Sequence, residues 1–256
     1  MSTLQTYEKW SARAYLDQYY SGDTIPDDSE VLISFLRRNL GDRRFGTCLD
    51  FGCGPSVYAH FAIVDRYDEV TWADYVAENR SEVQKWIDRS DDAFGWSHYA
   101  RHALGLAGLE PTEAAIVALE SQLRRKSAHV IPADITSTLP LGEKRSFDLV
   151  VSFFCLECVG GDVSEWFIYV RRLCSLVSSG GRLIMVALRD SSFYKVHAYQ
   201  YPVTALDSHT VRNAMNEIED LDLTTLAIEE HAVNDWFDEG FSGIILVKVD
   251  KKEQRS

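Results

Sequence analysis

The sequence predicts an α/β fold with a Rossmann-like sheet of seven strands, mostly parallel, and helices on both faces. Short apolar or β-branched runs alternate with amphipathic stretches, the pattern of strands joined by crossover helices. One apolar strand runs into Gly52 and Gly54 and then into a helical pattern from Ser56, as at a ligand-binding turn. The length of 256 residues suffices for one large core. We therefore expect a single domain over residues 1–256.

The strands and helices follow from the spacing of apolar residues. Seven short runs bounded by turn residues predict strands at residues 47–51, 69–73, 128–131, 147–153, 182–188, 224–229 and 243–249. Five stretches with apolar residues three and four positions apart predict helices at residues 29–40, 77–88, 111–126, 163–177 and 209–218. The helix at 111–126 also begins with Pro111 and ends in basic residues, as helices prefer.

Two segments depart from this alternation, residues 1–45 before the first strand and residues 90–127 as an insert. Extra segments on an α/β scaffold often build specificity. Either can close over a ligand as an aromatic lid, or its rings can simply pack cap helices. The aromatic residues are Trp10, Tyr15, Tyr19 and Tyr20 in the first segment and Phe94, Trp96 and Tyr99 in the second.

The charge balance argues against several classes of partner. Asp and Glu total 39 against 26 Lys and Arg, a formal net charge of −13, so nucleic acid and anionic membranes are disfavoured. No run of about 18 apolar residues is present to span a bilayer. The N-terminus has neither a basic start nor an apolar core, so we expect a cytoplasmic protein.

Metal binding and disulfides are not expected. The five cysteines form an odd set without framework spacing, which predicts reduced and mostly buried thiols. Cys155 and Cys158 form a CxxC pair with no second pair, and His98 and His102 lie four residues apart with no third ligand nearby.

The glycine turn and the acidic residues after the strands predict a nucleoside site. Gly52 and Gly54 allow a tight turn and the close approach of a ligand. Asp74 follows 22 residues after Gly52, where a carboxylate can bind the hydroxyls of a ribose, and Asp134 after the third strand can bind an adenine amino group. A dinucleotide is disfavoured because Val57 stands where its third glycine would be. The alternative for Asp50, Asp74 and Asp134 is a helix-cap or turn role.

Several segments in order give the chain a resemblance to the small-molecule methyltransferases typified by nicotinamide, phenylethanolamine and indolethylamine N-methyltransferases. The matching segments are YLDQYY (15–20), LDFGCGPSVY (49–58), DY (74–75) with Asn79, EVQKW (82–86), AFGWS (93–97), CLE (155–157), GG (180–181) with LIM (183–185), and SSFY (191–194). The resemblance covers nearly the whole chain. It implies a methyltransferase that uses S-adenosylmethionine, a sheet whose last strand is antiparallel, and an N-terminal helical lid.

The resemblance also implies roles for residues of the cofactor site. Gly52 and Gly54 form the turn, Asp74 and Asn79 bind the ribose, and Tyr58 reaches the carboxylate. Phe153 stands where some relatives have a small hydroxyl residue. Tyr15 and Tyr20 of the lid lie at the methionine end and are suited to the sulfonium, because aromatic faces attract a positive charge. The other implied cofactor residues, around the adenine, are Tyr75, Asp134 and Ile135.

The substrate is expected to be a small aromatic amine or indole. An alkylamine with a pKa of about 10.4 is protonated at neutral pH, so the site needs a base to remove the proton or an acidic group to bind the ammonium. Glu157 matches a pocket carboxylate of the phenylethanolamine enzyme and is the expected catalytic contact, together with Tyr20. Val186 stands where the nicotinamide enzyme has an aspartate, which disfavours nicotinamide. The other expected substrate contacts are Tyr19, Phe154, Tyr194 and His197.

Three functions follow from this reading. The first is N-methylation of an arylalkylamine or indole-type amine by a monomer. The second is C-methylation of an indole or another electron-rich ring, with Glu157 as the base. The third is a non-catalytic protein that binds the cofactor, which the joint presence of Gly52, Gly54, Asp74 and Glu157 disfavours.

Overall fold

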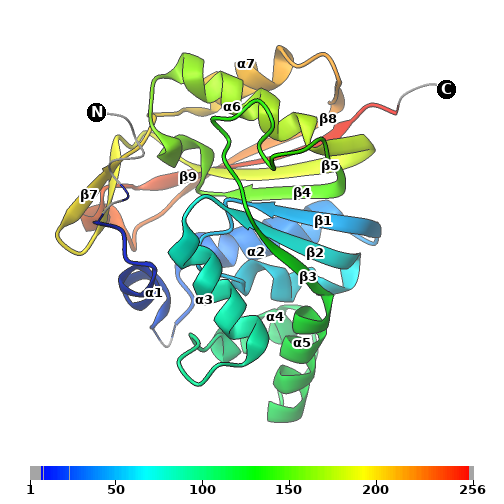
Figure 1. The fold of residues 1–256 in the computed structure, drawn as a ribbon, viewed down its shortest axis with the longest axis vertical. Helices are drawn as coiled ribbons and strands as arrows, with labels where there is room; N and C mark the ends of the chain where they lie inside the picture. The colour runs from blue at the N-terminus through cyan, green and yellow to red at the C-terminus, as the bar shows by residue number, and fades with distance from the viewer. Residues whose placement is uncertain (1–6, 8, 23, 254–256) are drawn as a thin grey trace.

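The computed structural model describes residue 7, residues 9–22 and residues 24–253. Its centre is a seven-stranded sheet in the order β3-β2-β1-β4-β5-β9-β8 (Figure 1). The strands are β1 (Phe45–Phe51), β2 (Tyr67–Asp74), β3 (Ser127–Pro132), β4 (Phe147–Phe153), β5 (Val177–Leu188), β8 (Leu221–Ala232) and β9 (Gly243–Lys251).

The strand directions confirm the predicted sheet. β1 pairs in parallel with β2 and β4, β2 with β3, and β4 with β5. β9 is antiparallel to both of its neighbours, β5 and β8. The last strand is therefore the antiparallel one, and the carboxyl ends of β1, β2 and β4 share one edge of the sheet, where ligands bind in open α/β sheets.

Helices cover both faces, as predicted (Figure 1). One face packs α6 (Val163–Ser175) and α7 (Ser208–Asn216) over a core that includes Trp166, Leu173 and Val211. The opposite face packs against a core that includes Phe35, Trp72 and Trp86. Its helices are α2 (Asp27–Leu40), α3 (Ala77–Asp88), α4 (Ser97–Leu106) and α5 (Glu113–Lys126).

Several elements differ from the sequence prediction. The helix expected after the glycine turn is a short 3-10 helix, η2 (Tyr58–Ala62). Strand β5 begins at Val177, where a helix was predicted to end. It starts there because Val177 already pairs with Phe147 of β4, before the pairing of Arg182 with Leu149. β6 (Phe193–Val196) and β7 (Tyr199–Pro202) form a hairpin that periodicity did not indicate. By contrast, α1 (Ala12–Tyr20) and α4 lie within the two extra segments and agree with the helical lid and cap helices expected there.

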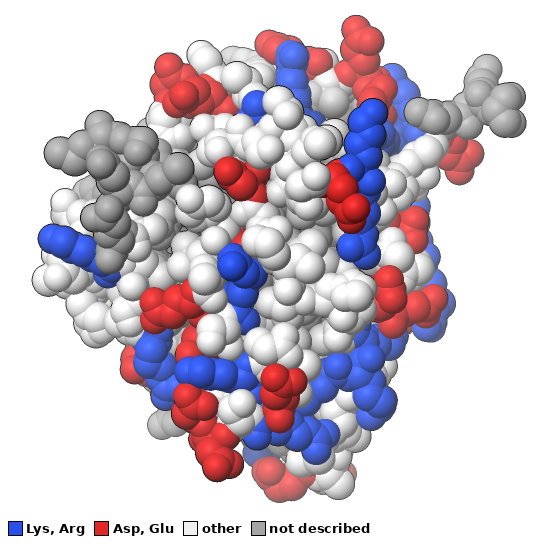
Figure 2. Space-filling view, in the orientation of Figure 1, with Lys and Arg blue, Asp and Glu red and all other residues white. Residues whose placement is uncertain are grey.

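Charged side chains of both signs are interspersed on the face that Figure 2 shows. In the parts of the chain that the structure describes, no helix combines the length and the hydropathy that crossing a membrane requires.

Candidate functional site

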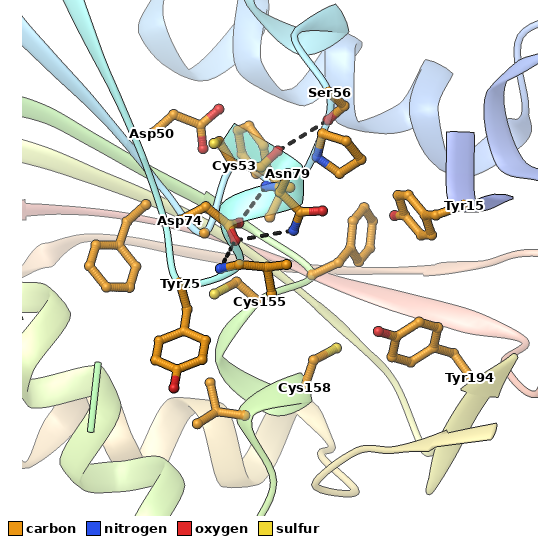
Figure 3. Close-up of a pocket in the computed structure, with 18 of the residues that line it drawn as sticks. Tyr15, Asp50, Cys53, Ser56, Asp74, Tyr75, Asn79, Cys155, Cys158 and Tyr194 are labelled. Carbon is orange, nitrogen blue, oxygen red and sulfur yellow. Dashed lines mark hydrogen bonds between the residues drawn. The ribbon is translucent and has the colours of Figure 1, made fainter. Parts of the chain in front are cut away.

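A cavity of about 490 Å³ lies at the carboxyl ends of β1, β2 and β4 and beneath α1. This volume falls within the range of small-molecule sites. Figure 3 shows Asp74 and Asn79 beside the glycine turn, with Tyr75 on one side and Tyr15 and Tyr194 on the opposite side. The cavity therefore joins a polar end, built from the first three strands, to an aromatic end, built from α1 and the second half of the chain.

Asp74 organises the polar end. It is buried at the end of β2, and its Oδ2 accepts a hydrogen bond from the Gly54 backbone N–H at 2.8 Å. Its Oδ1 accepts from the Val76 N–H at 2.8 Å and from Asn79 Nδ2 at 3.1 Å. A carboxylate has about four acceptor positions, so one on Asp74 is left for a ligand hydroxyl. Burial raises the pKa of Asp74, and these hydrogen bonds partly oppose the shift.

The two glycines of the turn have different reasons to be glycine. Both have positive φ, +70° at Gly52 and +59° at Gly54. A Cβ on Gly52 would lie 2.0 Å from Cys155 Sγ, so the loop after β4 can pack here only because residue 52 has no side chain. A Cβ on Gly54 would meet no atom within 4 Å, and Gly54 lines the cavity. Gly54 is thus the position at which a ligand can approach the backbone.

The residues expected around the adenine also line the polar end. Tyr75 is 49% exposed, so its ring is available to stack on a ligand. Asp134 lines the cavity while its Oδ1 accepts from the Thr136 N–H at 2.8 Å and the Thr136 hydroxyl at 2.6 Å. The turn role considered for Asp134 is therefore present. Ile135 and Phe153 line the same cavity.

The aromatic end is lined by tyrosines from α1, η2 and β6. The hydroxyls of Tyr15 and Tyr20 are 3.3 Å apart, and the rings of Tyr20 and Tyr58 are 5.2 Å apart. Burial raises the pKa of the Tyr15, Tyr20 and Tyr58 hydroxyls, so they stay neutral hydrogen-bond donors at neutral pH. Tyr7, Tyr19 and Tyr194 also line this end.

Hydrogen bonds on two sides fix α1 over the cavity. On one side Trp10 Nε1 donates to Asn79 Oδ1 at 2.7 Å, and the Ala12 N–H donates to Glu78 Oε1 at 3.0 Å. On the other side the Tyr19 hydroxyl donates to the Lys195 carbonyl at 2.6 Å. The His197 N–H donates to Gln18 Oε1 at 2.6 Å. α1 therefore bridges α3 and the β6–β7 hairpin, as a lid would.

Three of the expected substrate contacts are not among the residues that line the cavity. Glu157 is buried behind its wall, and its Oε1 accepts from the N–H of Leu188, which does line it, at 2.9 Å. Burial raises the pKa of Glu157 to about 7. Val186 is buried within β5, and His197 is exposed in the turn of the β6–β7 hairpin. Phe154 lines the cavity from a left-handed backbone conformation, with φ of +53°.

Sequence reasoning assigned no specific ligand role to three acidic residues that line the cavity, Asp28, Asp50 and Glu165. Asp28 lies in the first turn of α2, where acidic residues usually favour the helix dipole, so the sequence gave no sign of a site there. Asp50 belongs to the glycine-turn segment, and a cap or turn role was its alternative. Its Oδ2 is 3.0 Å from His60 Nε2, and His60 Nδ1 is 2.8 Å from the Tyr67 hydroxyl. Asp50 Oδ1 is buried without a partner in the described structure.

The cavity fits S-adenosylmethionine, the cofactor that the sequence resemblance implies. The acceptor position left on Asp74 suits a ribose hydroxyl, and the open backbone at Gly54 admits a ligand. The unpartnered Asp50 Oδ1 suits an ammonium group. Over residues 7, 9–22 and 24–253, no group of three or more His, Cys, Asp or Glu side chains is placed to hold a metal ion.

Comparisons with known proteins agree on one family. The family model described as "NNMT/PNMT/TEMT family" matches residues 1–252. Mouse (Mus musculus) indolethylamine N-methyltransferase is 28% identical over 222 residues, 83% of this chain and 83% of that protein. Human (Homo sapiens) phenylethanolamine N-methyltransferase is 29% identical over 228 residues, 84% of this chain and 79% of that protein. Human nicotinamide N-methyltransferase is 27% identical over 218 residues, 81% of each chain.

Solved structures share the fold at low sequence identity. The N-methyltransferase NodS from Bradyrhizobium japonicum WM9, in complex with S-adenosyl-l-homocysteine, has a TM-score of 0.55 at 16% identity and covers 99% of this chain and 100% of its own. Magnesium protoporphyrin IX methyltransferase from Synechocystis PCC 6803 has a TM-score of 0.55 at 10% identity, with 97% of each chain covered.

Proposed function

Since the chain belongs to the NNMT/PNMT/TEMT family and is an S-adenosylmethionine-dependent methyltransferase, we propose that it methylates the nitrogen of a small aromatic amine. The observation that carries this proposal is the single cavity in which a nucleoside-type polar end meets an end lined by tyrosines. The relatives named for indolethylamine and phenylethanolamine support an aromatic amine.

We assign the polar end to the cofactor. Asp74 and Asn79 bind the ribose, Tyr75, Asp134 and Ile135 surround the adenine, and Gly54 lets the ligand approach the backbone. Gly52 keeps the turn packed against Cys155, and Phe153 lines the wall. At the methionine end the neutral hydroxyls of Tyr15, Tyr20 and Tyr58 donate hydrogen bonds, and their rings face the positive charge.

The chemistry depends chiefly on positioning. S-adenosylmethionine, when bound, supplies an electrophilic methyl group. The chain must hold the amine nitrogen at roughly 3–3.5 Å from that carbon and exclude water. Tyr19, Tyr194 and Phe154 provide flat surfaces that fit an aromatic ring. α1 covers both ligands, because it is bonded to α3 at the cofactor end and to β6 at the substrate end.

Glu157 enters this proposal as a positioning residue. Its carboxylate holds the backbone of Leu188, which lines the cavity, and it does not line the cavity itself. N-methylation with Glu157 as the amine anchor and C-methylation with Glu157 as the base both placed this side chain at the substrate, so its position does not distinguish them. N-methylation is supported by the relatives, which are named N-methyltransferases.

The proposal is tested by cofactor binding and by turnover. We expect calorimetry to detect binding of S-adenosylmethionine and S-adenosylhomocysteine, and mass spectrometry to detect one added methyl group on the nitrogen of an arylalkylamine. Asp74→Asn should weaken S-adenosylhomocysteine binding by about tenfold, because the ribose loses a charged acceptor. Asp68→Asn, at an exposed position on the same strand, is the control and should bind as the wild type does. Equal affinities for the Asp74 variant and the wild type would contradict the assignment.

A further inference from the structure

Asp28 is a buried carboxylate at the aromatic end of the cavity. Its Oδ1 accepts hydrogen bonds from the Ser29 N–H at 2.8 Å and from Trp236 Nε1 at 3.2 Å. Its Oδ2 has no hydrogen bond within the described chain, and no described Lys, Arg or His side chain forms an ion pair with it. One oxygen of a cavity-lining carboxylate is thus left for a ligand.

Aromatic rings surround this carboxylate. The Trp236 ring that donates to Asp28 lies 4.8 Å from the Tyr19 ring, and Tyr19 lies 4.9 Å from Tyr15. Tyr15, Tyr19 and Tyr58 line the same cavity as Asp28, and its negative charge contributes to the raised pKa of all three hydroxyls. A carboxylate beside several aromatic faces is the environment that binds an organic ammonium ion.

The rest of the cavity has the same charge preference. Among the described residues its charged lining side chains are all acidic, with no Lys or Arg. A buried carboxylate without a cationic partner is costly, and a cationic ligand removes that cost. An anionic or neutral ligand at this end would leave Asp28 uncompensated.

We propose that Asp28 binds the ammonium group of the substrate and so selects aromatic amines with a cationic side chain over their neutral isosteres. This inference rests on the proposed function and names the residue that sets its substrate class. The cofactor's own ammonium group has a separate partner, since Asp50 Oδ1 is buried, lines the cavity and is unpartnered in the described structure.

The pH dependence of amine binding supports a test. Burial raises the pKa of Asp28 to about 6, with further contributions from Asp27 and Asp235. Above that pH the carboxylate is charged and binds the ammonium; below it the carboxyl group is neutral and affinity falls. Several titratable groups interact electrostatically with Asp28, and His231 pairs with its neighbour Asp27. The groups that interact with Asp28 are Tyr15, Tyr19, Tyr58, Tyr99, Asp27 and Asp235.

The experiment compares an amine with its alcohol on protein saturated with S-adenosylhomocysteine, so that no turnover occurs. Calorimetry would measure Kd for indolethylamine and for indole-3-ethanol, in which a hydroxyl replaces the ammonium, with phenylethanolamine as a second amine. The variants are Asp28→Asn and Glu30→Gln; Glu30 is exposed in the same helical turn and has the same charge.

We expect wild type and Glu30→Gln to prefer the amine by about tenfold or more, and Asp28→Asn to lose this preference. S-adenosylhomocysteine affinity should be the same in all three proteins, and the acidic limb near pH 6 should be absent from Asp28→Asn. The inference is overturned if the variant keeps the preference, if the wild type has none or binds neither amine, or if the variant loses S-adenosylhomocysteine affinity equally. Failure of the wild type to bind S-adenosylhomocysteine would instead overturn the proposed function.

Discussion

At the scale of single residues, burial decides what each carboxylate can do. Asp74 is buried yet receives three hydrogen bonds, two of them from backbone N–H groups. Glu157 is also buried, and its side chain receives a hydrogen bond from Leu188. Asp28 lines the cavity, and its two hydrogen bonds are both made by Oδ1. The sequence assigns roles to Asp74 and Glu157 by motif and none to Asp28, whereas the structure distinguishes all three carboxylates by their hydrogen-bond partners.

Glu157 should make the stability of the protein depend on pH. Its pKa is raised from 4.5 to about 7 in the folded chain, so the folded state binds this proton more tightly than the unfolded state. Stability from this group is therefore present below pH 4.5 and is lost as pH rises to about 7. Over that window the wild type should lose about 3 kcal/mol of unfolding free energy relative to Glu157→Gln.

Urea unfolding at a series of pH values measures this difference. Glu143→Gln, at an exposed position, should follow the wild type at every pH. A wild type and a Glu157→Gln variant that change in parallel would show that Glu157 does not titrate in this range.

At the scale of elements, α1 differs from the rest of the site because contacts outside the seven-stranded sheet hold it in place. Ser11 caps it, with its hydroxyl accepting from the Ala14 N–H at 3.2 Å. The helix then supplies Tyr15, Tyr19 and Tyr20 to the cavity. Its position depends on hydrogen bonds to α3 and β6, elements that are far away in the sequence.

Removal of this cap should weaken cofactor binding. Ser11→Ala should cost about 1 kcal/mol of helix stability, and so about fivefold in S-adenosylhomocysteine affinity if α1 must be ordered to bind it. Hydrogen exchange should become faster at the amides of residues 12–20. Thr112→Ala removes an equivalent cap from α5, where Thr112 also accepts from an N–H at 3.2 Å. That variant should affect α5 alone, and an equal loss of affinity in both variants would argue against a lid role.

At the scale of the whole molecule, charge should govern how fast substrate arrives. The net charge is −13, and the charged side chains that line the described cavity are acidic. Such a field attracts a cation and increases its association rate.

Salt should therefore slow the association of an aromatic ammonium ion. Between about 0.01 M and about 1 M salt the Debye length falls from about 30 Å to about 3 Å, and we expect the association rate to fall about tenfold. Stopped-flow tryptophan fluorescence would measure it. The neutral alcohol of the same ring is the control, and an equal salt effect on both compounds would rule out electrostatic attraction as the cause.

The sequence predicts the sheet well because its strands are short apolar runs with clear ends. All seven strands of the sheet and the glycine turn with Asp74 follow from local patterns, and the antiparallel last strand follows from the family resemblance. The β6–β7 hairpin and α1 do not, since long-range contacts such as that between Tyr19 and Lys195 hold them. The local sequence predicts a helix start at Asp28 and a pocket residue at Glu157. Only the tertiary structure shows that Asp28 lines the cavity and that Glu157 does not. The single domain, the monomer and the cytoplasmic location stay predictions.

The contact between the cofactor turn and the loop after β4 has a consequence for how this protein can change over evolution. The space that a side chain at position 52 would need is filled by the Cys155 thiol and its Cβ. A larger residue at 52 is therefore tolerable only if position 155 becomes smaller, and the positive φ of +70° still penalises it. The two positions constrain each other across about a hundred residues of sequence, so a redesign of either segment has to treat them as one unit.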